Sequence, residues 1–148
     1  MTVDPIHRDV VRAMVLGDDQ RVEEIRPQMP EQKSAEYFSF VSAVFCVVVD
    51  VRFPEPAEID DVVRFVEGMK YDFRAANPAI KPLVIETAIR GVLGEEHLVD
   101  DLDAAEMHSA QLQVLRKIVF DSAEIKTKID ALLSDAEDLA REWDDEEG

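Results

Sequence analysis

The sequence predicts an all-α fold, a compact bundle of about six to seven helices that ends in an amphipathic helix or helix pair. Apolar residues recur at helical spacing along most of the chain, and prolines and glycines stand where those helices would begin and end. No stretch makes a convincing strand. The chain has 148 residues, 47% of them hydrophobic, which is enough to build a core without a metal or a disulfide. We therefore expect one helical domain over residues 1–143.

The N-terminal part, residues 5–29, is predicted to form a helical hairpin. Pro5 is well placed in the first turn of a helix, and Gly17 directly follows the last apolar residue of that helix. Asp18 or Asp19 is a suitable cap for a second, shorter helix. Two short helices joined by a glycine turn would lie side by side.

The central body, residues 31–94, contains the most apolar stretch of the chain, Phe38 to Val49. The β-branched part, Val44 to Val51, fits a strand on propensity alone. Length favours a helix, because the segment runs for about 20 residues without glycine or proline, whereas strands usually have about five or six. Its apolar character extends nearly all round, as expected for a central helix covered by neighbours. The single cysteine, Cys46, is predicted to be a small buried thiol in this helix.

Two amphipathic helices complete the central body. The first runs from Ala57 to Met69, after a break at Pro54, and has apolar residues on one face and acids opposite. The second starts near Pro82 and stops at Gly94. Gly91 lies inside this second helix, where glycine costs about 1 kcal/mol relative to alanine. We therefore expect another element to pack closely against Gly91.

The C-terminal part, residues 95–143, carries a regular apolar seam. Residues 104–143 can form either one long helix or two helices divided near Asp121 to Glu124. We favour the break, because these residues resemble a helix cap and average helices are much shorter than 40 residues. The seam favours packing against the rest of the chain over a partner or dimer interface. Its members are Leu115, Ile118, Ser122, Ile125, Ile129, Leu132, Ala136, Leu139 and Trp143.

The negative charge is concentrated in the same part of the chain. The formal net charge is −17, and residues 95–148 hold 17 acids against 5 bases. Such an excess disfavours direct binding of nucleic acid or of anionic membrane surfaces, both of which attract lysine and arginine. The N-terminus has no signal-peptide pattern, and no apolar stretch reaches the about 20 residues of a membrane-spanning helix. We expect a cytoplasmic protein with a disordered acidic tail over residues 144–148.

The sequence offers few signs of catalysis or of a bound cofactor. It has no Gly-rich phosphate loop, no His-Glu-x-x-His motif and no Cys-x-x-Cys motif. The weak metal candidates are His97 and Asp100, which would share one helical face, although a solvated helix start explains these residues better. Of the other histidines, His7 has charged neighbours and is expected to be exposed, and His108 is expected to be half-buried. We expect no cofactor.

The predicted function is that of a non-catalytic, acidic helical module or regulator that binds a protein partner. Trp143 and Leu139 are predicted as apolar contacts, and Glu142 and Asp138 as carboxylates that attract a basic partner. A homodimer through the C-terminal helices is the related hypothesis. Two alternatives stay open. One is an inhibitor that mimics nucleic acid and occupies a basic DNA- or RNA-binding protein. The other is a helical enzyme or small-ligand carrier with a His/carboxylate site near residues 95–108.

Overall fold

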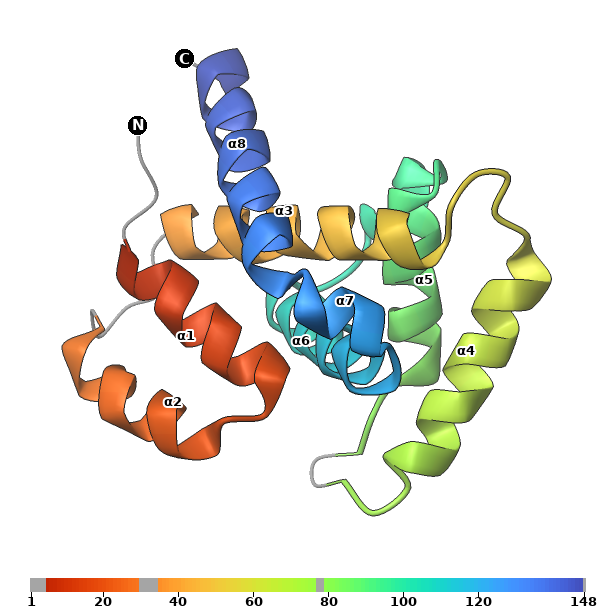
Figure 1. The fold of residues 1–148 in the computed structure, drawn as a ribbon. Helices are drawn as coiled ribbons and strands as arrows, with labels where there is room; N and C mark the ends of the chain where they lie inside the picture. Colours follow the sequence, from red (N-terminus) through yellow and green to blue (C-terminus); the bar gives the residue numbers. More distant parts are fainter. Residues whose placement is uncertain (1–4, 30–34, 77–78, 148) are drawn as a thin grey trace.

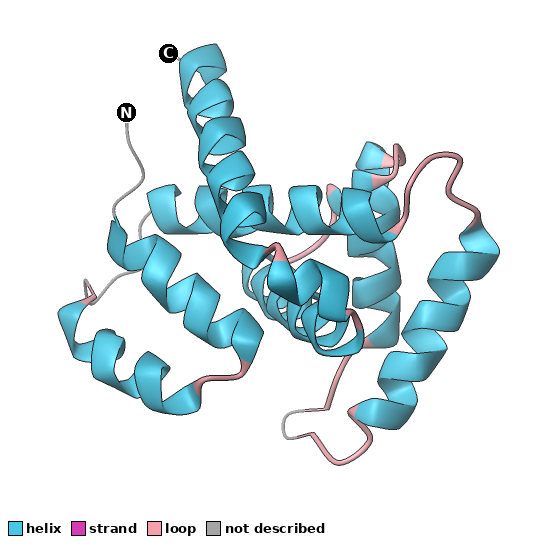
Figure 2. Cartoon of the chain, in the orientation of Figure 1, coloured by secondary structure: helices cyan, strands magenta, loops and turns pink. Residues whose placement is uncertain are grey.

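The computed structural model describes residues 5–29, 35–76 and 79–147, with only the backbone of residue 147. Over these ranges the chain forms eight α-helices and two short 3-10 helices without any strand, which confirms the all-α prediction (Figures 1 and 2). No helix in the described ranges combines the length and apolar character that crossing a bilayer requires. The elements in chain order are α1 (Pro5–Leu16), α2 (Asp19–Ile25), η1 (Arg26–Gln28), α3 (Ala35–Arg52), α4 (Ile59–Asp72), α5 (Pro82–Val92), η2 (Glu96–Val99), α6 (Ala104–Asp121), α7 (Ala123–Thr127) and α8 (Ile129–Glu147).

Helix α3 is the centre of the fold. It packs against α8, α6, α5 and α1, and Figure 1 shows it running across the middle of the molecule. Its Tyr37, Phe40 and Phe45 side chains are almost completely buried, together with several valines. Neighbours on nearly every side explain why this helix is apolar nearly all round, as predicted. Cys46 is only partly buried, so it lies nearer the surface than expected.

The N-terminal helical hairpin forms as predicted, from α1 and α2. Gly17 has a φ of +72°, a backbone conformation that side chains other than glycine rarely adopt, and it ends α1. The carboxylate of Asp18 caps α2 by accepting a hydrogen bond from the backbone N–H of Arg21 at 3.1 Å. Arg8 joins α1 to α8, because its guanidinium lies 2.5 Å from Oε1 of Glu137.

Helices α4 and α5 and the short η2 form the other side of the molecule. Helix α5 packs against α4, α6 and η2. A Cβ atom built on Gly91 of α5 would lie 2.6 Å from Cγ1 of Val99 on η2, which is closer than carbon atoms can approach. The close packing expected at Gly91 is therefore confirmed. Gly94 has a φ of +121° and follows the end of α5, as predicted.

The C-terminal segment is broken twice. At the first break Ser122 caps α7, because its hydroxyl accepts a hydrogen bond from the N–H of Ile125 at 3.2 Å, and this confirms the predicted division. The second break, at Lys128, is not marked by glycine or proline and was not predicted. The Thr127 hydroxyl just before it donates to the Ala123 carbonyl at 2.8 Å, a local bond of the kind that bends helices. The extra break accounts for the eighth helix.

The apolar seam is part of the chain's own core, and the helix that carries it runs further than expected. Helix α8 continues through Glu147, so residues 144–147 are helical, and the predicted disordered tail is wrong for them. Once a helix exists, each added residue gains a hydrogen bond at little cost, and no glycine or proline lies between Gly94 and Gly148. Gly148 lies outside the described residues. The buried seam members are Leu115, Ile118, Ile125, Ile129, Leu132 and Ala136.

Candidate functional site

The four predicted partner-binding residues on α8 are divided between two faces of the helix. Trp143 and Leu139 are half-buried and pack against the core of the chain itself. Asp138 and Glu142 are exposed, and Asp138 accepts a hydrogen bond from Arg141. A partner that reaches these carboxylates would therefore contact only the exposed parts of the Leu139 and Trp143 side chains. Partner binding at this place stays a prediction.

Helix α8 nevertheless presents a row of exposed carboxylates. Asp135, Asp138, Glu142 and Asp145 follow one another at spacings of three and four residues, so they share one face of the helix. Figure 1 shows that the C-terminal half of α8 extends past α3, away from the rest of the fold. This row is therefore accessible to another molecule.

The weak metal candidates lie at η2. His97 and Asp100 are both exposed, and no group of three or more His, Cys, Asp or Glu side chains suited to a metal comes together in the described part of the chain. The nearby Glu95 has a different role. Arg90 donates to its two carboxylate oxygens at 2.6 and 2.9 Å, and these hydrogen bonds lower the pKa of Glu95. The pair joins the end of α5 to η2.

Two of the three histidines surround a buried tyrosine at the start of α3. His7 is 3% exposed, so the expectation of an exposed side chain is wrong. Its spacing of three and seven residues from Val10 and Met14 places it on the apolar face of α1, whatever its charged neighbours. The Tyr37 hydroxyl lies 3.4 Å from Nε2 of His108, which is half-buried as predicted. The ring centroids of His7 and Tyr37 are 5.6 Å apart.

Neither Tyr37 nor Cys46 is an activated nucleophile. Burial raises the pKa of Tyr37 to about 12. Burial, with a smaller contribution from the Asp50 carboxylate, raises the pKa of Cys46 to about 11. Both groups keep their protons at neutral pH, whereas catalytic thiols and phenols usually need a lowered pKa. These buried groups therefore give no support to the enzyme hypothesis.

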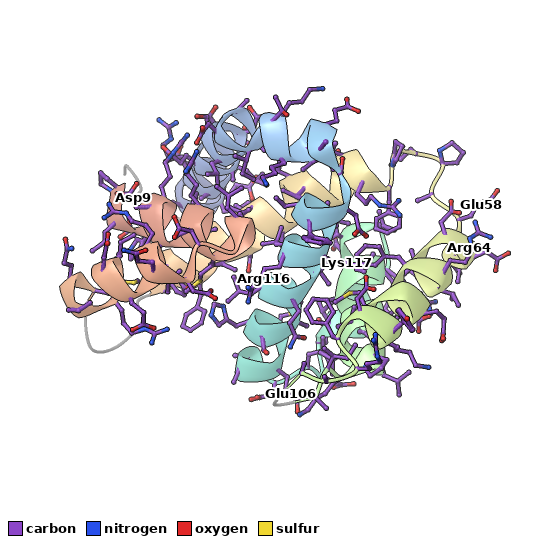
Figure 3. All side chains as sticks on the ribbon, turned by 60° about the horizontal axis from the view of Figure 1, so that its bottom comes forward. Asp9, Glu58, Arg64, Glu106, Arg116 and Lys117 are labelled. Atoms are coloured by element: carbon purple, nitrogen blue, oxygen red, sulfur yellow. The ribbon has the colours of Figure 1, made fainter. Side chains whose placement is uncertain are left out.

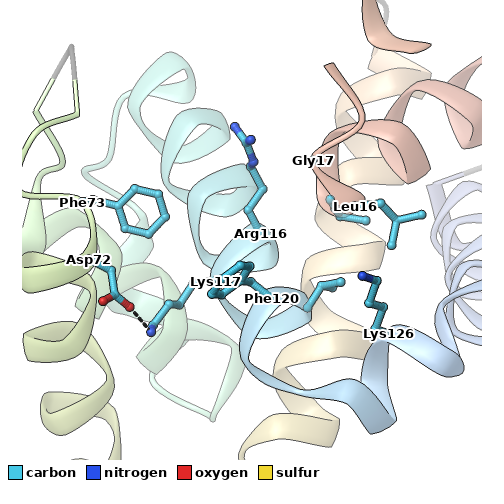
Figure 4. Close-up of a pocket in the computed structure, with 10 residues that line it drawn as sticks. Leu16, Gly17, Asp72, Phe73, Arg116, Lys117, Phe120 and Lys126 are labelled. Atoms are coloured by element: carbon cyan, nitrogen blue, oxygen red, sulfur yellow. Dashed lines mark hydrogen bonds and ion pairs between the residues drawn. The ribbon is translucent and has the colours of Figure 1, made fainter. Parts of the chain in front are cut away.

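A groove lies where the α1–α2 turn approaches the ends of α4 and α6 and the short α7 (Figure 4). Its volume is about 540 Å³. In Figure 4, Asp72 and Phe73 lie on one side and Leu16 and Gly17 on the other, with Phe120 between them. We call it the Phe120 groove, and it is lined by residues 15–17, 72–73, 116–117, 119–120 and 126.

Phe120 dominates the apolar part of this groove. Among the described residues it is the most exposed large hydrophobic side chain, with 87% of its surface accessible. Phe73 is half-buried and adds a second aromatic ring to the lining. Complete burial of a phenylalanine side chain contributes about 2 kcal/mol, so a molecule that covered Phe120 would gain most of that amount.

Lys117, one of three cations in the Phe120 groove, is already neutralised by the chain itself. Its ammonium is mostly buried and donates to Asp72 of α4 and to Asp121, the latter at 2.6 Å. Burial by itself lowers the pKa of Lys117, but the hydrogen bonds to Asp121 and Asp72 outweigh it and the pKa is raised. Lys117 therefore stays charged and ties α4 to α6.

The other two cations, Arg116 and Lys126, are open to a ligand. The Arg116 guanidinium has only a loose contact of 3.9 Å with the exposed Asp19. Lys126 makes no ion pair with any residue that the structure describes. Most other lysines and arginines in the described ranges hold a carboxylate at 3.2 Å or closer. In Figure 3, Arg116 lies between α6 and the N-terminal hairpin. The lining of the Phe120 groove therefore holds three cations against one acid, on a protein of net charge −17.

Sequence patterns alone do not reveal the Phe120 groove, because its lining comes from four segments that are distant in sequence. One signal was available. Phe120 falls outside the spacing of the seam residues Leu115, Ile118 and Ser122, so a helix that buries the seam leaves this ring on another face. An aromatic ring off the seam, one turn after Arg116, indicates a surface that can bind another molecule.

Comparisons with known proteins do not place the chain in a family: no family model, no curated protein and no solved structure matches it.

Proposed function

We propose that this chain is a non-catalytic protein-interaction module and that the Phe120 groove binds a segment of its partner. The observation that carries the proposal is the exposure of Phe120, 87% accessible beside a groove of about 540 Å³. Aromatic and arginine side chains are enriched at the centres of protein interfaces, and here Phe120 stands one helical turn from Arg116. A partner that buries the ring gains about 2 kcal/mol from that contact.

The openness of the Phe120 groove favours a protein segment over a small molecule. A site for a small ligand encloses roughly 70–90% of the ligand surface. Phe120 is almost fully accessible, so a small molecule lying against its ring would itself remain largely in water. A protein segment can cover the ring and also reach the surface around it. The extra buried area is what a shallow apolar groove needs for stable binding.

The proposal is tested by Phe120→Ala with Leu83→Ala as the matched control. Leu83 is 78% exposed in the first turn of α5 and does not line the Phe120 groove, so both variants remove a large exposed apolar side chain. Tagged wild-type protein and both variants are used to capture partners from an extract of the cells that produce it. We expect a partner recovered with wild type and Leu83→Ala to be lost with Phe120→Ala. Equal recovery with all three proteins contradicts the proposal.

A second candidate function is the binding of a basic partner by the carboxylate row on α8. The exposure of Asp135, Asp138, Glu142 and Asp145 on one face supports it. Rows of carboxylates attract cationic surfaces over several ångströms and raise association rates. The same row is what a nucleic-acid mimic would use, so this candidate includes that alternative.

The carboxylate row is tested by the double variant Asp138→Asn/Glu142→Gln, which removes two charges while keeping side-chain size. The control is Glu23→Gln/Glu24→Gln on α2, where two exposed carboxylates lie far from α8 in sequence. Binding of a basic partner should weaken in the α8 variant alone and should fall steeply with salt. An equal loss in both double variants would show only a general effect of net charge and would remove this candidate.

A further inference from the structure

We infer that the segment bound by the Phe120 groove is acidic and carries an apolar side chain between its carboxylates. This inference rests on the proposed function and specifies the chemistry of the partner. The inferred segment is negatively charged, whereas the protein's net charge of −17 by itself favours a positively charged partner. The reason is that the charge of the groove differs from the charge of the molecule around it.

The local charge of the groove comes from Arg116 and Lys126. Asp72 is the one acid in the lining, and it shares the Lys117 ammonium with Asp121, which lies just outside the lining. The loose 3.9 Å contact with Asp19 leaves the Arg116 guanidinium able to form the short, paired hydrogen bonds that a carboxylate offers. Lys126 has no carboxylate partner among the described residues. Both cations are therefore free to pair with the carboxylates of a ligand.

The positive surface continues beyond the groove toward α4. A smaller adjoining hollow of about 240 Å³ shares Lys117 with the groove, and its lining adds Arg52 and Arg64 but also the acids Asp61 and Asp121. Arg64 is paired with Asp61, but the Arg52 guanidinium stacks on the Phe53 ring, 4.6 Å from its centroid. Stacking leaves the donors at the edge of the guanidinium available. A segment longer than the groove would therefore meet further positive charge.

The positions of the two open cations set the pattern of the segment. Arg116 lies one helical turn before Phe120 on α6, and Lys126 follows on α7, so the cations flank the ring from two sides (Figure 4). A bound segment that packs an apolar side chain on Phe120 would place its flanking residues near these cations. Carboxylates at those positions are attracted, whereas lysine or arginine there would meet like charge and be rejected.

The acidic remainder of the protein does not prevent this contact. At physiological ionic strength charges are screened beyond about 8 Å, so the net charge acts mainly on the approach and the local cations act on the bound state. Salt therefore weakens the distant repulsion and the local attraction together. For that reason the test relies on charge reversal at named residues and not on salt dependence.

The experiment uses three synthetic peptides of equal length and isotope-labelled full-length protein, with binding followed by nuclear magnetic resonance. The first peptide has a leucine and a phenylalanine flanked on both sides by aspartate and glutamate. The second has lysine in place of the acids, and the third keeps the acids but has serine in place of the apolar residues. Each is titrated into wild type, into Arg116→Glu/Lys126→Glu, and into the control Arg26→Glu/Lys70→Glu, whose two sites lie outside the groove lining.

We expect the acidic apolar peptide to shift the amide signals around Phe120 and to bind at least about tenfold more tightly than the other two. The groove variant should lose that preference, and the control should keep it. Stronger binding of the lysine peptide in the groove, an equal effect of both double variants, or no shift near Phe120 with any peptide would each overturn the inference. Self-association of the wild type that the groove variant abolishes would assign the groove to a second copy and overturn it as well.

Binding of a partner in the Phe120 groove and the acidic chemistry of that partner can be disproved separately. If partner capture is lost with Phe120→Ala but survives Arg116→Glu/Lys126→Glu, the acidic chemistry is wrong and the interaction module stands. If capture is unaffected by Phe120→Ala, the groove itself is not the binding site.

Discussion

The ammonium of Lys117 on α6 donates to the carboxylate of Asp72 at the end of α4, and so joins helices whose contacting residues are 45 positions apart. Asp121 shares the same ammonium at 2.6 Å. The bridge lies at the boundary of two hollows, because Lys117 lines both the Phe120 groove and the adjoining hollow. The groove therefore depends on a buried cation that is not itself available for binding.

The substitution Lys117→Met should lower the free energy of unfolding by about 1 kcal/mol, because Asp72 and Asp121 would be left without their shared cation. The pKa of Lys117 is raised, so its contribution is fully present below the unfolded-state pKa, near 10.5, and is lost as pH rises through the folded-state value. Urea unfolding of wild type and variant should thus differ at pH 8 and converge in strong alkali. Lys70→Met removes an exposed pair and should change little at either pH. A Lys117→Met protein as stable as Lys70→Met would contradict the bridge.

The buried phenol of Tyr37 should make the protein sensitive to alkali. Its pKa is about 12 in the folded state against an ordinary value of 10.0, so the unfolded chain loses the proton first. Stability is unaffected below pH 10 and falls between pH 10 and 12, by about 1.4 kcal/mol for each pKa unit. Tyr37→Phe should show a smaller fall over that range than wild type. The control Tyr71→Phe, at an exposed position, should follow wild type, and identical curves for all three proteins would refute the burial argument.

Two helical glycines should respond to alanine in opposite directions. A Cβ at Gly91 would meet Cγ1 of Val99 at 2.6 Å, so Gly91→Ala should cost about 1–3 kcal/mol through overpacking. Gly68 on α4 has nothing within 4 Å of the same atom, and Gly68→Ala should stabilise by about 0.5–1 kcal/mol through helix propensity. Thermal or urea unfolding measures both. A neutral Gly91→Ala would mean that η2 moves away without cost.

Deleting residues 124–148 should unfold the protein and not merely remove a partner site. This segment buries Ile125, Ile129 and Leu133, and α8 is the main packing partner of α3. Loss of several buried aliphatic side chains at about 2–5 kcal/mol each exceeds the stability of a typical domain. Circular dichroism and dispersion of amide resonances report the outcome. Removal of residues 144–148 alone is the control and should leave the fold intact, while a folded, monomeric 1–123 fragment would contradict the assignment of the seam to the core.

The helices could be predicted because the residues that begin and end them act over only a few positions of the sequence. Gly17 and Gly94 end helices through their positive φ values, and Ser122 caps α7. The break at Lys128 has no such local signal. It accompanies a hydroxyl hydrogen bond within α7, and neither glycine nor proline marks the position. The charged neighbours of His7 predict an exposed side chain, whereas its spacing places it on the apolar face of α1, where it is buried.

The Phe120 groove could not be predicted in the same way. Helical spacing places Phe120 off the buried seam, but which distant segments approach that face of α6 depends on tertiary packing, which local sequence does not determine. The state of each cation is also a tertiary property. Lys117 and Arg116 are neighbours in sequence, yet one is buried between two carboxylates and the other is open. By contrast, the exposed carboxylates on α8 follow directly from helical spacing.

The most direct measurement is site-specific photo-crosslinking in the cells that produce the protein. A photo-reactive amino acid replaces Phe120 in one protein, Leu83 in a second and Glu142 in a third, and all three positions are exposed. We predict a discrete protein adduct from position 120, with the crosslink mapping to an acidic segment of the partner, and none from position 83. An adduct from position 142 with none from position 120 would contradict the groove and transfer the function to the carboxylate row on α8.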